Sequence, residues 1–253
     1  MSESPRSLST VRRAFQVLDA LWQLDGAGPT EIAAYMDIPN STAHEYLRAL
    51  EHTPWVSAER GTYTLSSYVL TMAGKMRHRN QLFHVAKEEM RRAATDTGEL
   101  VGLTIEEGGS GIILHQEEGA RALSLGTYLG AATPLHTNAS GKAILAMLPE
   151  SRSAPVLGRD SLPQRTDHTI TDPDVLRLEL DGIRRQGYAV DWDEQVVGMG
   201  MAAVPILVEE SVLGSICIVA PTERVKNRSY QDTLIETLQE IAQTVAINYQ
   251  FGR

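Results

Sequence analysis

Three carboxylates, Asp191, Asp193 and Glu194, lie together in one short segment of the chain. Carboxylates at this spacing can act as general acids and bases, or as ligands of hard cations. Together with His136, Asp191 and Glu194 would suit a hydrolytic or isomerising site in a metabolite-converting enzyme. The simpler interpretation places these carboxylates on an exposed polar loop, and we favour it over catalysis.

A second informative segment runs from Gly130 to Lys142 and is followed by the apolar residues 143–148. This order predicts a loop that leads into the N-terminus of a helix. Free N–H groups, the helix dipole and the Ser140 hydroxyl would there form a site for a carboxylate. A phosphate-binding P-loop is excluded, because His136 stands where that motif needs glycine and Ala143 where it needs Ser or Thr. An ordinary junction between a loop and a helix remains the alternative.

Metal-binding chemistry has little support in the sequence. The seven histidines are scattered, and Cys217 is the single cysteine. This distribution excludes a disulfide framework and a thiolate metal cage. Met199 and Met201 are flexible and apolar, which suits the wall of a small-molecule pocket or an ordinary core. We therefore expect no metal and no cofactor.

The N-terminal part of the chain predicts a DNA-binding module. One amphipathic helix is expected over residues 11–22, a second from Thr30, and a third that Asn40 caps. Two short strands, at residues 55–58 and 62–65, follow around a turn. Three helices and a hairpin in this order predict a winged helix-turn-helix over residues 1–66. A helical protein-interaction domain is the alternative.

In a winged helix the third helix enters the major groove with its polar face. Here Ala43, Leu47 and Leu50 define the opposite, apolar face. Hydroxyls in the first turn would reach phosphates, and a histidine and an arginine would reach base edges. The predicted DNA contacts are Asn40, Ser41, Thr42, His44, Glu45, Arg48 and, at the tip of the wing, Arg60.

The remaining chain predicts a linker helix and a larger α+β domain. Val69, Met72, Ala73 and Met76 mark a linker helix within residues 67–80, which could contribute to a dimer contact. Residues 81–253 begin and end with a helix. Extended segments are expected at residues 100–106, 112–117, 123–128, 201–208 and 212–219. Hairpins flanked by helices favour a mainly antiparallel sheet.

The charge of the chain is unevenly distributed. The net charge is −9, yet residues 1–80 hold eight basic and eight acidic residues, so the whole deficit lies in residues 81–253. The predicted DNA-binding part is thus neutral, which implies few phosphate contacts. No apolar run approaches the roughly 18 residues of a membrane helix, and the first residues lack a secretory pattern. We expect a cytoplasmic protein without membrane contact.

Several segments, taken in order along the chain, resemble the IclR family of transcriptional regulators. The matching segments are Pro39–His44, Pro134–Ala143, Asp167–Asp172, Glu179–Leu180, Arg184–Ala189 and Asp191–Gly198. The resemblance implies a winged helix, a linker helix and a GAF-like effector-binding domain, assembled as a homodimer or homotetramer. By position it implies an effector pocket formed by Leu125, Thr133, Ala139, Ser140, Asp191, Met199, Met201, Cys217 and Val219.

The chain departs from the commoner pattern of that family at a few positions. A basic residue is frequent in place of Asn40, and arginine in place of Glu45. The acidic residue in the third helix resembles haloarchaeal members. Gly200-Met201 replaces a frequent Arg-Cys pair, which makes the implied pocket more apolar.

We therefore expect a regulator, repressor or activator, that binds a double-stranded DNA operator. A small organic acid or sugar acid in the C-terminal domain would control it. A metabolite-converting enzyme, or an interaction module without ligand, are the alternatives from other classes.

Overall fold

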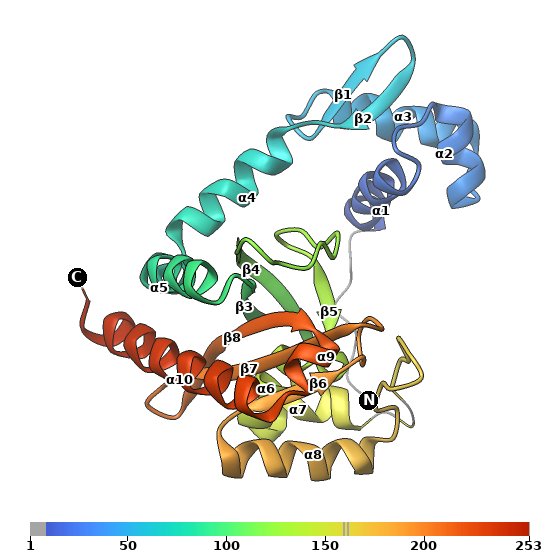
Figure 1. The fold of residues 1–253 in the computed structure, drawn as a ribbon. Coiled ribbons are helices and arrows are strands. Elements are labelled where there is room, and N and C mark those ends of the chain that lie inside the picture. The colour runs from blue at the N-terminus through green and yellow to red at the C-terminus, as the bar shows by residue number, and fades with distance from the viewer. Residues whose placement is uncertain (1–8, 159, 161, 253) are drawn as a thin grey trace. The chain divides into compact units, whose positions relative to one another are not determined.

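The computed structural model describes residues 9–158, 160 and 162–252. The chain divides into two compact units, with the boundary between Arg79 and Asn80 (Figure 1). Each unit has its own hydrophobic core. The predicted combination of a winged helix with an α+β domain is confirmed, and each unit is described separately below.

The N-terminal unit consists of helices followed by a two-stranded hairpin and a further helix. Its elements are α1 (Ser9–Gln23), α2 (Pro29–Met36), α3 (Asn40–Glu51), β1 (Val56–Glu59), β2 (Thr62–Leu65) and α4 (Tyr68–Arg79). The strands pair antiparallel around Arg60 and Gly61, which have φ angles of 52° and 86°. An additional bridge joins Ala27 to Tyr63 and ties the start of α2 to the hairpin. The hairpin is therefore the predicted wing.

The amphipathic helix expected over residues 11–22 forms as α1, but only some of its apolar residues are buried. Val17, Ala20 and Leu21 form the buried stripe, whereas Phe15 and Trp22 are 61% and 64% exposed. Apolar residues cover more of this helix than one core can bury, so the periodicity alone did not identify the face that packs on α2 and α3. The outer apolar surface of α1 remains without a partner within the described part of this unit.

The turn between α2 and α3 also differs from the prediction. Asp37 adopts a left-handed conformation, with φ at 51°, and its N–H closes the end of α2 on Ala33. Asn40 is the first residue of α3 and not its cap, because Pro39 occupies the capping position. The Asn40 amide instead donates to the Thr30 hydroxyl at 3.2 Å, which connects the two helices.

The C-terminal unit is built on a six-stranded antiparallel sheet in the order β5-β4-β3-β8-β7-β6. The strands are β3 (Leu100–Glu107), β4 (Ser110–Glu118), β5 (Ala132–Pro134), β6 (Ala189–Trp192), β7 (Met199–Val208) and β8 (Ser211–Pro221). The helices are α5 (Gln81–Thr97), η1 (Leu135–Thr137), α6 (Ala139–Met147), α7 (Glu150–Leu157), α8 (Pro173–Gln186), α9 (Thr222–Val225) and α10 (Arg228–Phe251).

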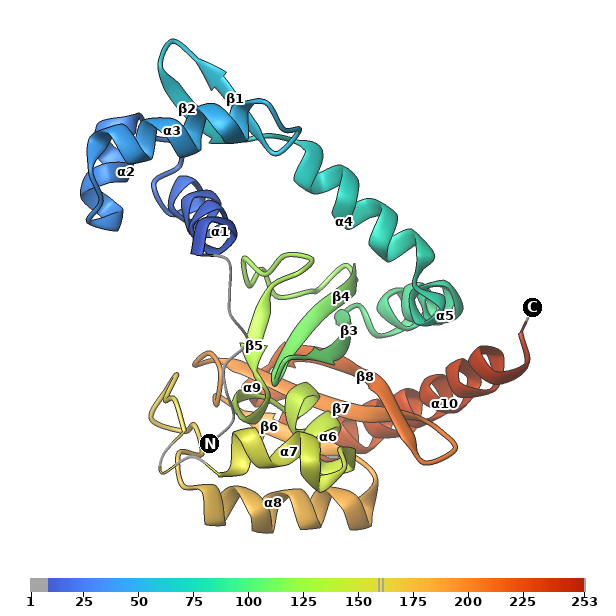
Figure 2. The same cartoon turned by 180° about the vertical axis from the view of Figure 1, so that it is seen from behind.

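Helices cover both faces of this sheet (Figure 2). One core joins α5 and α10 to residues such as Leu103, Val204 and Ile218, and a second joins α6, α7 and α8 to Met201, Cys217 and others. Alternate residues of a strand point to opposite faces, so each strand supplies both cores. Double coverage explains why β7 and β8 are almost continuously apolar.

Several elements of this unit were not predicted, among them β5, β6, α7 and α9, and two further differences concern residues 123–128 and α8. Residues 123–128 are irregular and do not form the expected strand. Gly126 has a φ of 64°, and the edge of β4 pairs instead with the short β5. Helix α8 was missed, although Asp172 caps it and Gly187 ends it in the left-handed conformation.

Candidate functional site

The outer face of α3 holds most of the predicted DNA contacts. Ala43, Leu47 and Leu50 are buried against the unit's core, which fixes the orientation of the helix. Asn40, Ser41, His44, Glu45 and Arg48 are exposed on the opposite side, and Thr42 is half-buried. This is the orientation that a recognition helix needs.

Arg60 lies apart from α3, at the tip of the hairpin. Its side chain is 92% exposed, and its only close carboxylate among the described residues is Glu59, at 4.0 Å. An ion pair at that distance and exposure contributes little, so the guanidinium is available to a phosphate. Helix α3 and the wing are thus two separate exposed polar elements of one unit.

Replacing Arg48 by Ala should weaken binding to a specific operator by about 1–3 kcal/mol, because a bidentate contact to a base edge would be lost. Binding to unrelated DNA should change less. Fluorescence anisotropy with both kinds of DNA measures the difference. Arg91→Ala is the matched control, since Arg91 is exposed on α5 and paired with Glu88 at 3.1 Å. Equal losses for Arg48→Ala on both kinds of DNA would remove the base-reading role.

In the C-terminal unit, the predicted anion site at the start of α6 is filled by the protein itself. The N–H of Ala139 donates to Oδ2 of Asp191 at 2.6 Å, and Asn138 caps the helix by accepting from the N–H of Gly141 at 2.9 Å. Gly141 packs directly on Leu135, where a Cβ atom would overlap the Leu135 backbone. Asp191 on β6 therefore neutralises the positive end of α6.

The expectation of exposed carboxylates is wrong for Asp191 and Glu194. Asp191 is fully buried and Glu194 is 8% exposed. Strand β6 lies beside β7 in the sheet and directs Asp191 inward, below α6. Asp193, the third carboxylate, adopts a left-handed conformation and accepts from the Thr222 hydroxyl at 2.6 Å.

Lys142 is the cation that balances this buried charge. Its side chain is completely buried, and Nζ lies 2.6 Å from Glu194 Oε1 and 3.0 Å from Glu179 Oε1. Burial alone would lower the pKa of Lys142, but attraction to Glu194 and Glu179 outweighs burial and raises it. Lys142 therefore links α6 to α8 and to the turn that follows β6, a structural role that does not involve phosphate.

The pKa values of the two buried carboxyl groups, Asp191 and Glu194, differ from those of carboxyl groups in water. Burial raises the pKa of Asp191 to about 7, against the opposing effects of Lys142 and the Ala139 N–H. Burial also raises the pKa of Glu194, although Lys142 pulls in the opposite direction. The charge of Asp191 therefore changes near neutral pH.

A narrow cavity opens beside this cluster, between α6 and the face of the sheet that packs on it. Its free interior volume is about 40 Å³. Its apolar lining residues are Leu100, Ile113, Leu125, Met199, Met201 and Val219. Its other lining residues are Gly102, Thr104, Gln116, Thr127, Thr133, Asn138, Ser140, Gln195 and Cys217. Such a mixture of apolar surface and a few polar groups is typical of small-molecule sites.

Most residues of the predicted effector pocket meet at this cavity. Leu125, Thr133, Ser140, Met199, Met201, Cys217 and Val219 line it. Ala139 and Asp191 do not; they lie behind its wall, joined by their hydrogen bond. Burial raises the pKa of the Cys217 thiol to about 11, so this cysteine is a neutral lining group.

Sequence reasoning missed Gln116 and Gln195, which bring side-chain amides to the cavity. Gln195 accepts from Asn138 at 2.6 Å, and Gln116 donates to Thr127 at 3.0 Å. Gln195 directly follows the carboxylates Asp191, Asp193 and Glu194, so its place in this segment could have marked it as a candidate for the pocket. Gln116 lies on a strand, and which of its faces meets α6 was not evident from the sequence.

The residues proposed for catalysis do not form a site. The ring of His136 is buried, with Nε2 2.8 Å from the main-chain oxygen of Pro163. Glu194 is paired with Lys142, and Asp191 with the end of α6. None of His136, Asp191 and Glu194 is among the described residues that line the cavity. In the part of the chain that the structure describes, these three groups are therefore not positioned to exchange protons with a molecule in this cavity.

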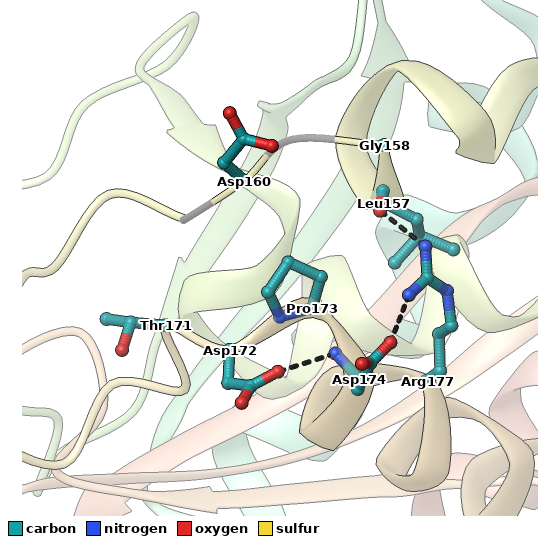
Figure 3. Close-up of a pocket in the computed structure, with 8 residues that line it drawn as sticks. All are labelled: Leu157, Gly158, Asp160, Thr171, Asp172, Pro173, Asp174 and Arg177. Carbon is teal, nitrogen blue, oxygen red and sulfur yellow. Dashed lines mark hydrogen bonds and ion pairs between the residues drawn. The ribbon is translucent and has the colours of Figure 1, made fainter.

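A surface hollow lies where α7 ends and α8 begins (Figure 3). Its polar groups serve local structure. Asp172 accepts from the N–H groups of Asp174 and Val175 at 2.7 and 3.4 Å, and Arg177 donates to Asp174 at 2.5 Å and to the carbonyl of Leu157 at 2.6 Å. No predicted site residue lies there.

Within residues 9–158, 160 and 162–252, no group of three or more His, Cys, Asp or Glu residues is placed to hold a metal ion. Within the same residues, no helix is long and apolar enough to cross a bilayer.

Comparison with known proteins agrees with both halves of this description. Residues 10–60 match the IclR helix-turn-helix domain, and residues 74–247 match the bacterial transcriptional regulator IclR C-terminal domain. A probable HTH-type transcriptional regulator, ArcR of Halobacterium salinarum, is 28% identical over 97% of this chain and 95% of its own length.

Solved structures that resemble this chain are also IclR-type regulators. The Thermotoga maritima IclR structure is 28% identical, with a TM-score of 0.71, and covers 95% of this chain and 100% of its own. An IclR homolog from Microbacterium hydrocarbonoxydans, complexed with 4-hydroxybenzoate, shares the fold with a TM-score of 0.78 at 24% identity, over 96% of this chain and 98% of its own. The family matches span both units, and their members are regulators and not enzymes. The chain belongs to the IclR family of transcriptional regulators.

Proposed function

We propose that the protein binds a double-stranded DNA operator through α3 and the wing, and that a small molecule in the cavity of the C-terminal unit changes this binding. The observation that carries the proposal is the presence of an exposed polar recognition face on one unit and a lined cavity in the other. On this basis residues 1–66 form the DNA-binding domain, residues 67–80 the linker helix and residues 81–253 the effector-binding domain. Regulation of transcription would take place in the cytoplasm, where the DNA lies.

Apolar surface on the N-terminal unit supports self-association. Helix α4 buries none of its residues, and Leu70 and Met76 are 74% and 66% exposed. The outer side of α1, with Phe15 and Trp22, is similarly exposed. Large apolar side chains that stay exposed on two helices are typical of surfaces that contact another protein. A homodimer or homotetramer would cover it and present paired recognition helices to two half-sites.

Effector control means a coupling free energy between two sites, typically about 1–3 kcal/mol. The Microbacterium homolog holds 4-hydroxybenzoate, and in this chain the cavity between α6 and the sheet is the corresponding candidate for a small effector. The alternative of an enzyme has no support in the geometry, since the carboxylates and the histidine are committed to internal contacts.

A gel-shift experiment with DNA from both sides of the protein's own coding region tests the proposal. We expect specific retardation of at least one fragment that persists in an excess of unrelated competitor DNA. The double variant Arg48→Ala/Arg60→Ala should lose this retardation, whereas Arg91→Ala should retain it. Absence of specific retardation with every fragment would contradict the proposal.

A further inference from the structure

The cavity between α6 and the sheet is smaller than the ligand that it would have to hold. Its free interior volume is about 40 Å³. Sites for small molecules commonly enclose roughly 300–1,000 Å³, and a single water molecule takes about 30 Å³ of the liquid. A molecule larger than water can therefore enter this cavity only if part of its wall moves away.

Most of this wall is fastened to the rest of the unit. Strands β3, β7 and β8 pair along their length in the middle of the sheet. Helix α6 is tied to β8 by the hydroxyl groups of Ser140 and Ser215, whose oxygens lie 2.6 Å apart. The turn after β6 is tied to the start of α6 by the hydrogen bond from Asn138 to Gln195 at 2.6 Å. Movement on these sides would break buried hydrogen bonds, which is costly.

The segment of residues 122–129, between β4 and β5, is held much more weakly (Figure 2). It forms neither helix nor strand, and it supplies Leu125 and Thr127 to the cavity wall. Among the described residues, 123–127 make no backbone hydrogen bond. Their one hydrogen-bonded contact is that between Thr127 and Gln116, whose Nε2 donates to the threonine hydroxyl at 3.0 Å. Next to them, Tyr128 and Leu129 are 63% and 45% exposed.

Both ends of this segment are anchored, and a glycine lies within it. The N–H of Arg121 donates to the carbonyl of Gly98 at 2.6 Å, and the N–H of Gly130 donates to the carbonyl of Ile113 at 2.8 Å. Gly126 adopts the left-handed conformation, with φ at 64°, which glycine enters without strain. A segment with fixed ends and few contacts between them opens locally at a low cost in free energy.

From these observations we infer that residues 122–129 form a lid over the effector cavity. The lid is closed in this structure and opens while the rest of the C-terminal unit stays folded. The Gln116–Thr127 hydrogen bond keeps it shut, and Leu125 is the apolar side chain that it lifts out of the cavity wall. This inference rests on the proposed function, because it concerns how an effector reaches the site of the proposed regulator.

Cys217 reports lid opening without any knowledge of the effector. It lines the cavity, is 4% exposed and is the single cysteine of the chain. The reagent is methyl methanethiosulfonate, which is too large for the closed cavity, and mass spectrometry of the full chain measures its rate of reaction. We expect Cys217 to react at a rate that stays constant up to about 1 M urea, because opening a lid exposes little surface.

Thr127→Val tests the hydrogen bond that keeps the lid shut. Valine has nearly the shape of threonine but no hydroxyl, so the reaction of Cys217 should become about two- to tenfold faster. Ser124→Ala is the matched control, because it removes a hydroxyl from the same segment. Within the described residues the Ser124 hydroxyl has no hydrogen bond, so this variant should react at the wild-type rate.

Gly126→Ala strains the closed lid and not the open one. An added Cβ atom has open space there, so the effect comes from the left-handed backbone alone. We expect the reaction of Cys217 to become about fivefold faster or more. Gly187→Ala is the control, since Gly187 ends α8 with φ at 80° and has equally open space. It should lower the stability of the unit and leave the rate without urea unchanged.

Two results would overturn the inference. In the first, Cys217 reacts only under conditions that unfold the whole unit, with a rate that depends on urea as steeply as unfolding does. In the second, Cys217 reacts without unfolding but at the same rate in wild type, Thr127→Val and Gly126→Ala, so that another part of the wall moves. Neither result affects the proposed DNA binding, which gel shift measures without thiol labelling. Conversely, loss of specific DNA binding with intact lid behaviour would contradict the proposed function and leave the lid standing.

Discussion

Replacing Lys142 by Met is expected to destabilise the C-terminal unit by about 3–5 kcal/mol at pH 8, because it leaves buried carboxylates without their cation. Glu194 lies 2.6 Å from the lysine nitrogen, and the side chain of Lys142 has no exposed surface. Because methionine fills a similar volume, the loss of stability reflects the missing charge and not a newly formed cavity. Urea unfolding followed by circular dichroism measures the change.

Lys226→Met is the matched control for this substitution. Lys226 is 49% exposed, and its carboxylate neighbours Asp193 and Glu223 lie at 4.0 and 3.7 Å. Exposed pairs contribute about 0–1 kcal/mol, so this variant should be close to wild type in stability. The double variant Lys142→Met/Glu194→Met should recover part of the loss, because it removes both charges of the main pair. A Lys142→Met protein as stable as wild type would contradict the assigned role.

The second large effect concerns Asp191 and pH. Burial raises the folded-state pKa of Asp191 from 3.8 to about 7, so the folded state holds this proton more tightly than the unfolded state does. The unfolding free energy should therefore fall as pH rises from about 4 to about 7, by on the order of 4 kcal/mol from this group. Below pH 4 the group is protonated in both states and has no effect.

Asp191→Asn should remove this part of the pH dependence. Asparagine is uncharged at every pH, and its oxygen can still accept from the N–H of Ala139. The variant should be more stable than wild type above pH 7 and similar to it below pH 4, as measured by urea unfolding across that range. An unchanged slope between pH 4 and 7 would show that Asp191 does not titrate there.

Asp193→Asn is a control two residues away, for which we expect a change in stability of the opposite sign. The hydrogen bond from the Thr222 hydroxyl, followed by that from the Gly198 N–H, lowers the pKa of Asp193. Its ionised form therefore stabilises the folded state, and this contribution is lost as pH falls through the folded-state pKa. The asparagine variant should be less stable than wild type at neutral pH, whereas Asp191→Asn should be more stable.

Local signals in the sequence were sufficient for much of the fold. Gly98 ends α5 in the left-handed conformation, and the turn at Arg60 and Gly61 forms the wing. These elements depend on residues close to one another in the chain. The same holds for the polar face of α3, since a helix with one apolar stripe exposes its opposite side.

Features that depend on distant segments could not be predicted. Glu194, the partner of Lys142, lies 52 residues later in the sequence, after α8. The hydrogen bond between Ala139 and Asp191 also joins residues 52 positions apart. A carboxylate segment that resembles an exposed loop was thus buried by pairing of β6 with β7. The buried face of α1 was equally ambiguous, because Phe15 and Trp22 suit a core as well as an interface.

The most direct test of the account is the effect of a cavity ligand on DNA binding. Fluorescence anisotropy would give the Kd for a specific fragment with and without a saturating amount of a small molecule that binds in the cavity. We expect a change of about 5- to 150-fold in the wild-type protein. We expect no change in Leu125→Trp, where the larger side chain blocks the half-buried position at the cavity wall. An identical Kd with and without bound ligand in the wild-type protein would contradict the account.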